Sequence, residues 1–168
     1  MTGWQLAQIN VARLVAPEGD PAVQPFFDAL QRVNAIAEAS PGFVWRLADD
    51  GGLSATAIQA TADPLLLINM SVWQDAQSLF DYVYRSVHTP EMGRRREWFE
   101  RFDGAYLALW WIPAGTIPSI NDGLSRLWHL DRFGPTPHAF TFKLRFPPPG
   151  IADAPVDMQP DPWCMGRA

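Results

Sequence analysis

Apolar and polar residues alternate with a period of two along the first part of the chain. Between Trp4 and Leu14, Leu6 falls on one side of the backbone, whereas Ala7 and Ile9 fall on the other. This alternation is typical of a strand and is too regular for a helix. We therefore predict the first strand over residues 4–14.

Further strands are predicted where short apolar runs are bounded by turn residues. The turn Asp49-Asp50-Gly51-Gly52 favours a hairpin, so the small residues that follow it are predicted to pair back across it. The predicted strands cover residues 42–48, 54–60, 65–73, 105–112 and 141–146.

Between these strands, apolar residues recur every three or four positions, as in amphipathic helices. Asp20 and Pro21 supply a predicted N-cap and first-turn proline for a helix that runs to about Ala39. Ser119 and Asp122 match a capping box that opens a helix ending near Gly134. Two more helical stretches are predicted over residues 74–87 and from residue 90 to about 102.

This order of elements predicts one α+β domain over residues 1–146. An antiparallel sheet with helices on one face, of the ferredoxin-like split βαβ type, fits the order best. A chain of 168 residues is long enough for a single core. Six prolines between residues 147 and 162 exclude regular structure, so residues 147–168 are predicted to form a Pro-rich C-terminal tail.

The strands predicted over residues 65–73 and 105–112 are largely apolar on both faces. One layer of helices covers only one face of a sheet, so something else has to cover the other. A second copy packed face to face would do so and predicts a homodimer. Additional helices of the same chain on the second face are the alternative.

Charge and hydropathy exclude several classes of protein. The net charge of −5 argues against a nucleic-acid partner, and the basic run Arg94–Arg96 is flanked by glutamates, as on a solvated helix face. No segment approaches the ~20 apolar residues of a membrane span. No signal-peptide core is present near the N-terminus, so we expect a cytoplasmic protein.

The sequence contains no recognised catalytic motif. The three histidines are dispersed without metal-ligand spacing, and Cys164 has no neighbouring base. Gly51-Gly52 is a turn, and no glycine-rich loop suited to a phosphate, flavin or nicotinamide group occurs. We therefore expect no metal and no such cofactor.

His88 is the principal candidate for chemistry. It lies four residues after Tyr84, on the same flank of the apolar stripe of the predicted helix 74–87. Hydrogen bonding at the helix end is the commonest role for a histidine so placed, and acid–base catalysis and haem ligation are the alternatives. Tyr84 and Arg95 complete the candidate catalytic residues, with Arg95 suited to stabilise an oxyanion.

Eight Trp and ten Phe in 168 residues supply bulky apolar material for a core, an interface or a small-molecule pocket. A few polar groups among these rings would orient a planar or hydrophobic ligand. Besides Tyr84, His88 and Arg95, the predicted pocket residues are Arg46, Asn69, Trp73, Trp98 and Trp110.

Several segments are similar, in order, to a bacterial family, the domain of unknown function 3291 family. The segments are residues 4–10, 40–46, 88–99, 108–115 and 134–142, and the resemblance covers about residues 4–146. That family resembles the antibiotic-biosynthesis-monooxygenase group of dimeric α/β barrels, whose strand, Trp, helix and His pattern is similar to Ser71-Val72-Trp73 followed by His88. The resemblance implies a dimeric α/β barrel with a pocket and leaves the reaction open.

Two hypotheses follow. The first is a small-molecule enzyme of the cofactor-independent monooxygenase or isomerase type, in which His88 acts as acid–base. The second is a non-catalytic binding protein for a hydrophobic or planar ligand, with haem among the ligands.

Overall fold

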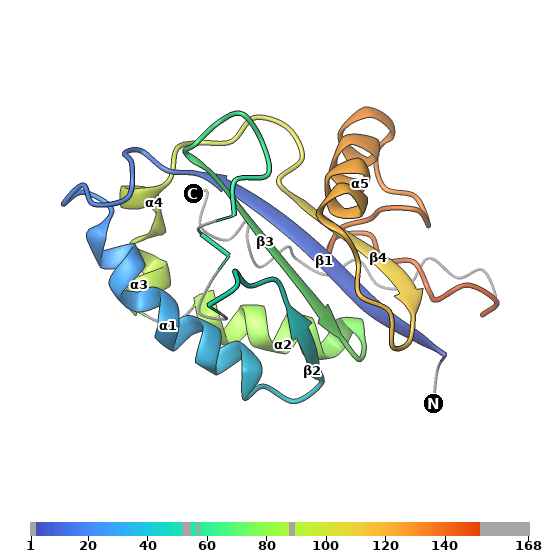
Figure 1. Cartoon of the computed structure of the whole chain (residues 1–168). Coiled ribbons are helices and arrows are strands. Elements are labelled where there is room, and N and C mark those ends of the chain that lie inside the picture. The colour runs from blue at the N-terminus through green and yellow to red at the C-terminus, as the bar shows by residue number, and fades with distance from the viewer. Residues whose placement is uncertain (1–2, 52–54, 57, 88–89, 152–168) are drawn as a thin grey trace.

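The computed structural model describes residues 3–51, 55–56, 58–87 and 90–151. Its centre is a four-stranded antiparallel sheet with the strand order β2-β3-β1-β4 (Figure 1). The strands are β1 (Trp4–Arg13), β2 (Phe43–Arg46), β3 (Leu66–Trp73) and β4 (Leu107–Pro113). The helices are α1 (Gln24–Glu38), α2 (Ala76–Val87), α3 (Pro90–Gly93), α4 (Arg95–Trp98) and α5 (Ile120–Phe133).

The topology confirms the predicted ferredoxin-like split βαβ fold. Strand β1 lies at the centre of the sheet and pairs with β3 on one side and β4 on the other. The connections β1-α1-β2 and β3-α2-β4 place α1 and α2 on the same face of the sheet. We call this the α1–α2 face. It carries the side chains of alternate strand residues, including Leu6, Gln8, Asn10, Ser71 and Trp73.

The opposite face of the sheet packs against α5, and we call it the α5 face. It carries Ala7, Ile9, Val11, Ile68, Met70, Val72, Ala108, Trp110 and Ile112, which form one buried cluster with Leu127 and Leu130 of α5. Figure 1 shows α5 against β1 and β4, apart from α1 and α2. The chain therefore follows the alternative in which its own helix covers the second face, and the homodimer stays a prediction that light scattering would test.

Helix α5 begins where the sequence predicts it, because the capping box forms. The Ser119 hydroxyl accepts a hydrogen bond from the Asp122 backbone N–H at 3.1 Å, and the Asp122 carboxylate accepts one from the Ser119 backbone N–H at 2.9 Å. Gly134 ends the helix with a φ of 73°, a value that favours glycine.

The first helix begins later than predicted. Asp20 accepts a hydrogen bond from the Ala22 N–H at 2.8 Å and so caps a turn that precedes the helix. The helix itself starts at Gln24, and Pro25 rather than Pro21 occupies its first turn. The N-cap position of the helix is thus Val23, which has no capping side chain, although the local signal of Asp20 and Pro21 is the stronger one.

Two predicted strands do not form. Residues 55–56 and 58–60 lie outside any strand, and β2 pairs directly with β3. Residues 141–146 form no strand either: Arg145 is a single bridge residue, and Phe140, just before the segment, makes an isolated bridge with both backbone hydrogen bonds to Leu109. Phe140 and Phe142 are nevertheless fully buried. The apolar pattern of this segment therefore indicates burial in the core but not pairing in a strand.

The helical stretch predicted from residue 90 to 102 divides into the short helices α3 and α4. Phe99 then adopts extended backbone angles and forms an antiparallel bridge with Leu14. This bridge ties the segment after α4 to the end of β1. Among the described residues, no helix is long and apolar enough to cross a membrane.

Candidate functional site

A cavity of about 670 Å³ lies between the α1–α2 face of the sheet and the helices α1, α2 and α4. Its floor consists of strand residues of β1 and β3, and its walls come from residues of the three helices. Small-molecule sites in proteins commonly have volumes of roughly 300–1,000 Å³. The cavity is therefore large enough for a small organic ligand.

Two pairs of polar side chains form the floor of the cavity. Gln8 lies directly opposite Ser71, and its Nε2 donates a hydrogen bond to the Ser71 Oγ at 2.9 Å. Asn10 lies opposite Asn69, whose Nδ2 donates to the Asn10 Oδ1 at 2.9 Å. The antiparallel register of β1 and β3 creates both pairs, because directly opposed residues share one face of the sheet. We call these four residues the amide band.

Aromatic rings close the end of the cavity near the start of β1. Trp73 is fully buried and donates a hydrogen bond from its Nε1 to the Ser71 Oγ at 2.8 Å. Tyr82 of α2 stacks on it with ring centroids 5.0 Å apart, and Phe43 meets it edge-on at 5.4 Å. The indole is therefore held in one orientation, and its hydrogen bond joins it to the amide band.

Charged residues lie at the other end of the cavity, where α4 approaches the end of β1. Arg95, Arg96 and Glu100 line this end. Glu100 bonds to Arg13 at 2.6 Å, and Arg13 also bonds to Asp63 at 2.8 Å. The Arg13 guanidinium hydrogen-bonds the Asp63 carboxylate and holds its pKa below the usual value, which keeps this carboxylate charged.

Arg46 approaches the cavity from β2, opposite Ser71. Its Nε donates to the Glu38 Oε1 of α1 at 2.7 Å, and its side chain is only 12 % exposed. The ion pair links the edge strand to the end of α1. Arg46 thus adds a largely buried guanidinium to the wall beside the amide band.

The structure brings four of the predicted site residues together. Arg46, Asn69, Trp73 and Arg95 all line the cavity. His88, the predicted acid–base, lies outside the described residues.

Three other predicted site residues lie away from the cavity. Tyr84 is 46 % exposed and stacks on Phe80 at 6.2 Å on the outer side of α2. Trp98 is buried against Phe26 and does not line the cavity. Their placement in a pocket wall is therefore wrong for this cavity.

Trp110 requires the clearest correction, because it lies on the opposite face of the sheet. It pairs with Ala7 in the register of β1 and β4, so its side chain belongs to the buried cluster beneath α5. The Arg126 guanidinium lies over its ring at 5.7 Å. Trp110 was grouped with Asn69 and Trp73 before the alignment of the strands was known. Which residues of β4 share a face with Asn69 and Trp73 of β3 depends on the pairing register of the strands.

Several cavity residues were not singled out from the sequence. Gln8 and Asn10 stand at alternate positions among the apolar residues from Leu6 to Ala12, and this interruption was a usable signal. Tyr82 and Arg96 carried no comparable signal, because each has a similar neighbour, Tyr84 and Arg95, in the same segment.

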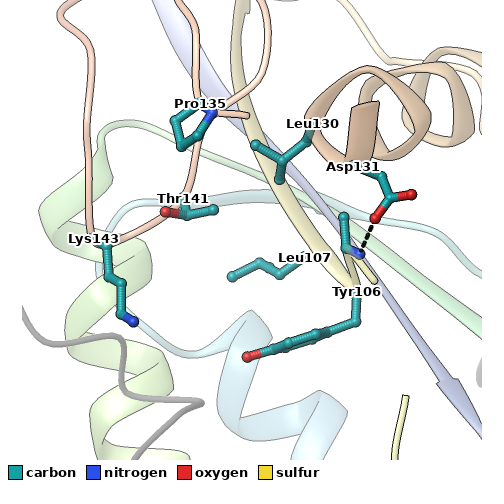
Figure 2. Close-up of a pocket in the computed structure, with 8 residues that line it drawn as sticks. Tyr106, Leu107, Leu130, Asp131, Pro135, Thr141 and Lys143 are labelled. Atoms are coloured by element: carbon teal, nitrogen blue, oxygen red, sulfur yellow. Dashed lines mark hydrogen bonds between the residues drawn. The ribbon is translucent and has the colours of Figure 1, made fainter. Parts of the chain in front are cut away.

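A second, smaller hollow of about 310 Å³ lies at the start of β4, beside the end of α5 (Figure 2). Tyr106 and Leu107 line both this hollow and the cavity. Asp131 accepts a hydrogen bond from the Ala105 backbone N–H at 2.9 Å, so its carboxylate serves the fold. Lys143 and Thr141 supply the other polar groups. The hollow has fewer polar groups and less room than the cavity.

Two histidines lie outside both hollows, near α5. The rings of His129 and His138 have centroids 4.6 Å apart, and the Arg126 Nη1 lies 3.0 Å from the His138 Nδ1. Burial and the nearby Arg126 lower the pKa of His138, which favours its neutral form. No group of three or more His, Cys, Asp or Glu residues suited to a metal ion occurs in the described part of the chain.

Comparison with known protein families gives a match over most of the chain. The model of the family described as a domain of unknown function, DUF3291, matches residues 5–155. The chain belongs to this family. The resemblance found in the sequence is thus confirmed, and no curated protein is similar enough to be matched.

Solved structures similar to this DUF3291 chain include three at low sequence identity. SnoaB, a cofactor-independent oxygenase from Streptomyces nogalater, is 15 % identical with a TM-score of 0.44 over 68 % of this chain and 98 % of that one. The NE2512 protein of unknown function from Nitrosomonas europaea is 11 % identical with a TM-score of 0.42 over 70 % and 97 %. A putative antibiotic biosynthesis monooxygenase from Bacteroides thetaiotaomicron is 13 % identical with a TM-score of 0.33 over 69 % and 93 %.

Proposed function

We propose that this DUF3291 protein binds a small, flat, largely apolar molecule in the cavity and converts it by proton-transfer chemistry. The observation that carries the proposal is the cavity of about 670 Å³ with aromatic walls and a hydrogen-bonded amide band on its floor. Apolar walls supply most of the binding free energy, and a few fixed polar groups orient the ligand. The reaction belongs to the cofactor-independent monooxygenase or isomerase type.

The proposed first step is removal of a proton from an electron-rich substrate, such as a phenol. His88 is the proposed base, on the grounds of its sequence position and the near-neutral pKa of an ordinary histidine. Arg95, which lines the cavity, is proposed to stabilise the resulting oxyanion. Tyr84 leaves the proposed catalytic set, because its side chain lies on the outer side of α2.

The second step separates the two reaction types. In an isomerase, the proton returns to a different atom of the substrate. In a monooxygenase, the substrate anion reduces O₂ itself: a CH₂ group becomes C=O, and the other oxygen atom leaves as water. Both need a site that excludes bulk water, and the stacked rings of Trp73 and Tyr82 suit that need.

The experiment is solvent exchange followed by oxygen consumption. A panel of phenolic compounds that carry an activated CH₂ group is incubated with the protein in D₂O under nitrogen, and NMR records exchange of the protons of that CH₂ group. Air is then admitted, and an electrode records O₂ uptake. We expect exchange by the parent protein and its loss, by at least about 100-fold, in His88→Ala.

His138→Ala is the matched control, since His138 lies near α5 and away from the cavity. It should exchange substrate at the parent rate. A His88→Ala protein as active as the parent would remove His88 from the mechanism. Binding without exchange or O₂ uptake would instead indicate a non-catalytic binding protein.

The binding protein is the second candidate function. Its support is that the polar side chains of the amide band already hydrogen-bond one another: the Ser71 hydroxyl and the Asn10 amide oxygen both accept such bonds. Side chains fixed in this way can orient a bound ligand without taking part in a reaction. The main proposal requires no cofactor. The alternative is that the protein binds haem through His88. Haem titration of the parent and of His88→Ala, followed by absorption spectroscopy, would reveal a haem band that depends on His88.

A further inference from the structure

The Ser71 hydroxyl accepts two hydrogen bonds and keeps one proton to donate. The Gln8 Nε2 donates to its Oγ at 2.9 Å, and the Trp73 Nε1 donates to it at 2.8 Å. A serine hydroxyl has two acceptor lone pairs and a single O–H donor, so only the proton remains unused. Ser71 is 6 % exposed, and within the described part of the chain its hydroxyl donates to no acceptor.

The neighbours of Ser71 on the α1–α2 face leave this proton one direction. Gln8 lies opposite Ser71 in β1, and Arg46 lies opposite it in β2. Asn69 and Trp73 stand two positions away along β3, on the same face. Gln8 and Trp73 present N–H groups, a guanidinium has no acceptor, and the Asn69 side chain bonds across to β1 instead. Because Ser71 lines the cavity, its O–H is directed away from the sheet into that cavity.

The two N–H groups also strengthen Ser71 as a donor. A hydroxyl that accepts hydrogen bonds is polarised by them, so its own proton forms a stronger bond. Both N–H groups are held in place, because Gln8 is 4 % exposed and the fully buried Trp73 stacks on Tyr82. A donor fixed in a buried site stabilises a developing negative charge more than the same donor in water. Ser71 is therefore positioned as a donor before any ligand binds.

We infer that Ser71 donates a hydrogen bond to an oxygen atom of the bound substrate and stabilises the negative charge that develops on that oxygen. The inference rests on the proposed function, because it adds an oxyanion donor to the same site. It narrows the substrate class to flat molecules whose ionising group is a phenol or enol oxygen that reaches the aromatic end of the cavity. Ser71 keeps its own proton throughout, because the base takes the proton that the substrate loses.

The test measures the ionisation of 6-cyano-2-naphthol in the cavity. The naphtholate absorbs at longer wavelength than the neutral naphthol, so a pH titration of the bound molecule gives the pH at which half of it is ionised. Ser71→Ala should raise this midpoint by at least about one pH unit, because a hydrogen bond to a charged oxygen is lost. Ser71→Cys is the second variant if Ser71→Ala does not fold. It keeps an acceptor for both N–H groups but donates weakly, so the midpoint should rise here too.

A second serine and a second compound provide the controls. Ser125 lies on α5 away from the cavity, and its hydroxyl donates to the Asp122 backbone carbonyl at 2.8 Å. Ser125→Ala should keep the parent midpoint. The compound 2-cyanonaphthalene has the same rings without the oxygen, so its affinity should be the same for the parent and the Ser71 variants.

Gln8→Leu tests which side chain is the donor. Under the inference, Ser71 keeps its proton and its bond from Trp73 in this variant, so the midpoint should rise less than in Ser71→Ala. A larger rise in Gln8→Leu than in Ser71→Ala would make the Gln8 amide the donor and overturn the inference.

The outcomes separate this inference from the proposed function. A rise of the midpoint confined to the Ser71 variants, with unchanged affinity for 2-cyanonaphthalene, supports it. If both compounds bind and the midpoint is the same in the parent and Ser71→Ala, the inference fails and the proposed site stands. If neither compound binds to the parent protein, the proposed site fails together with the inference.

Discussion

The two faces of the sheet are built from alternate residues of the same strands and differ in kind. On the α5 face, nine strand residues from Ala7 to Ile112 are apolar and at most 8 % exposed. On the α1–α2 face, the same strands present the amide band and enclose a cavity. The period of two in a strand permits this division, because substitutions on one face leave the other unchanged.

Helix α5 packs tightly against the sheet because of one glycine. A Cβ atom at Gly123 would lie 2.7 Å from the Ile9 Cδ1 and 3.1 Å from the Met70 Cε. The helix thus approaches the strands more closely than a larger residue would allow. The helices over the other face leave room for about 670 Å³. The α5 face is thus closely packed, while the α1–α2 face encloses the cavity of the proposed site.

The largest expected effect comes from truncating the α5 face. Trp110→Ala removes a side chain that is 1 % exposed, so the free energy of unfolding should fall by about 3–5 kcal/mol. Urea denaturation measures this loss. Ligand affinity of the folded fraction should stay within about twofold of the parent, and Trp110→Phe provides a milder variant if the first does not fold. A selective loss of affinity would contradict the division between the faces.

The opposite result is expected on the α1–α2 face. Gln8→Leu removes one donor to Ser71, but the Ser71 hydroxyl keeps its hydrogen bond from Trp73. The free energy of unfolding should therefore change by less than about 1 kcal/mol. Affinity for a cavity ligand should fall about tenfold, which corresponds to about 1.4 kcal/mol. Calorimetric titration and urea denaturation of one preparation would check both. A large loss of stability with unchanged affinity would contradict the role of Gln8 in ligand binding.

The smallest expected effect is a pH dependence confined to the α5 side. The pKa of His138 is lowered by burial and then by Arg126 and His129, so the unfolded chain binds a proton more readily than the folded one. This stability is fully present above the ordinary value of 6.5 and is lost as the pH falls through the lower folded value.

Thermal melts between pH 8 and pH 4.5 would detect this contribution. His138→Gln should flatten the melting temperature against pH below 6.5, whereas Gln8→Leu should keep the parent profile. Parallel curves for the parent and His138→Gln would show that His138 makes no such contribution.

Part of the candidate site was predictable from the sequence. Asn69 and Trp73 are four positions apart in one strand, so their side chains lie on the same face whatever the pairing. Arg46 and Arg95, also predicted, line the same cavity. Tyr84 was chosen because it lies four residues before His88 on the same flank of the helix, whereas Tyr82, two positions away, lies about 200° around the helix axis from Tyr84. Which of the two faces the sheet depends on how α2 docks, and the helix sequence alone does not specify that direction.

The sequence by itself determined the elements whose signals are local. The alternation of β1, the capping box of α5 and the stop at Gly134 depend on neighbouring residues, so they were readable before any partner was known. Tertiary structure decided what depends on distant residues. It opposed Gln8 to Ser71 and Ala7 to Trp110, left residues 141–146 outside the sheet, and placed α5 over one face. Strand pairing and helix docking are contacts between distant segments, and a local pattern limits which faces are apolar without choosing what covers them.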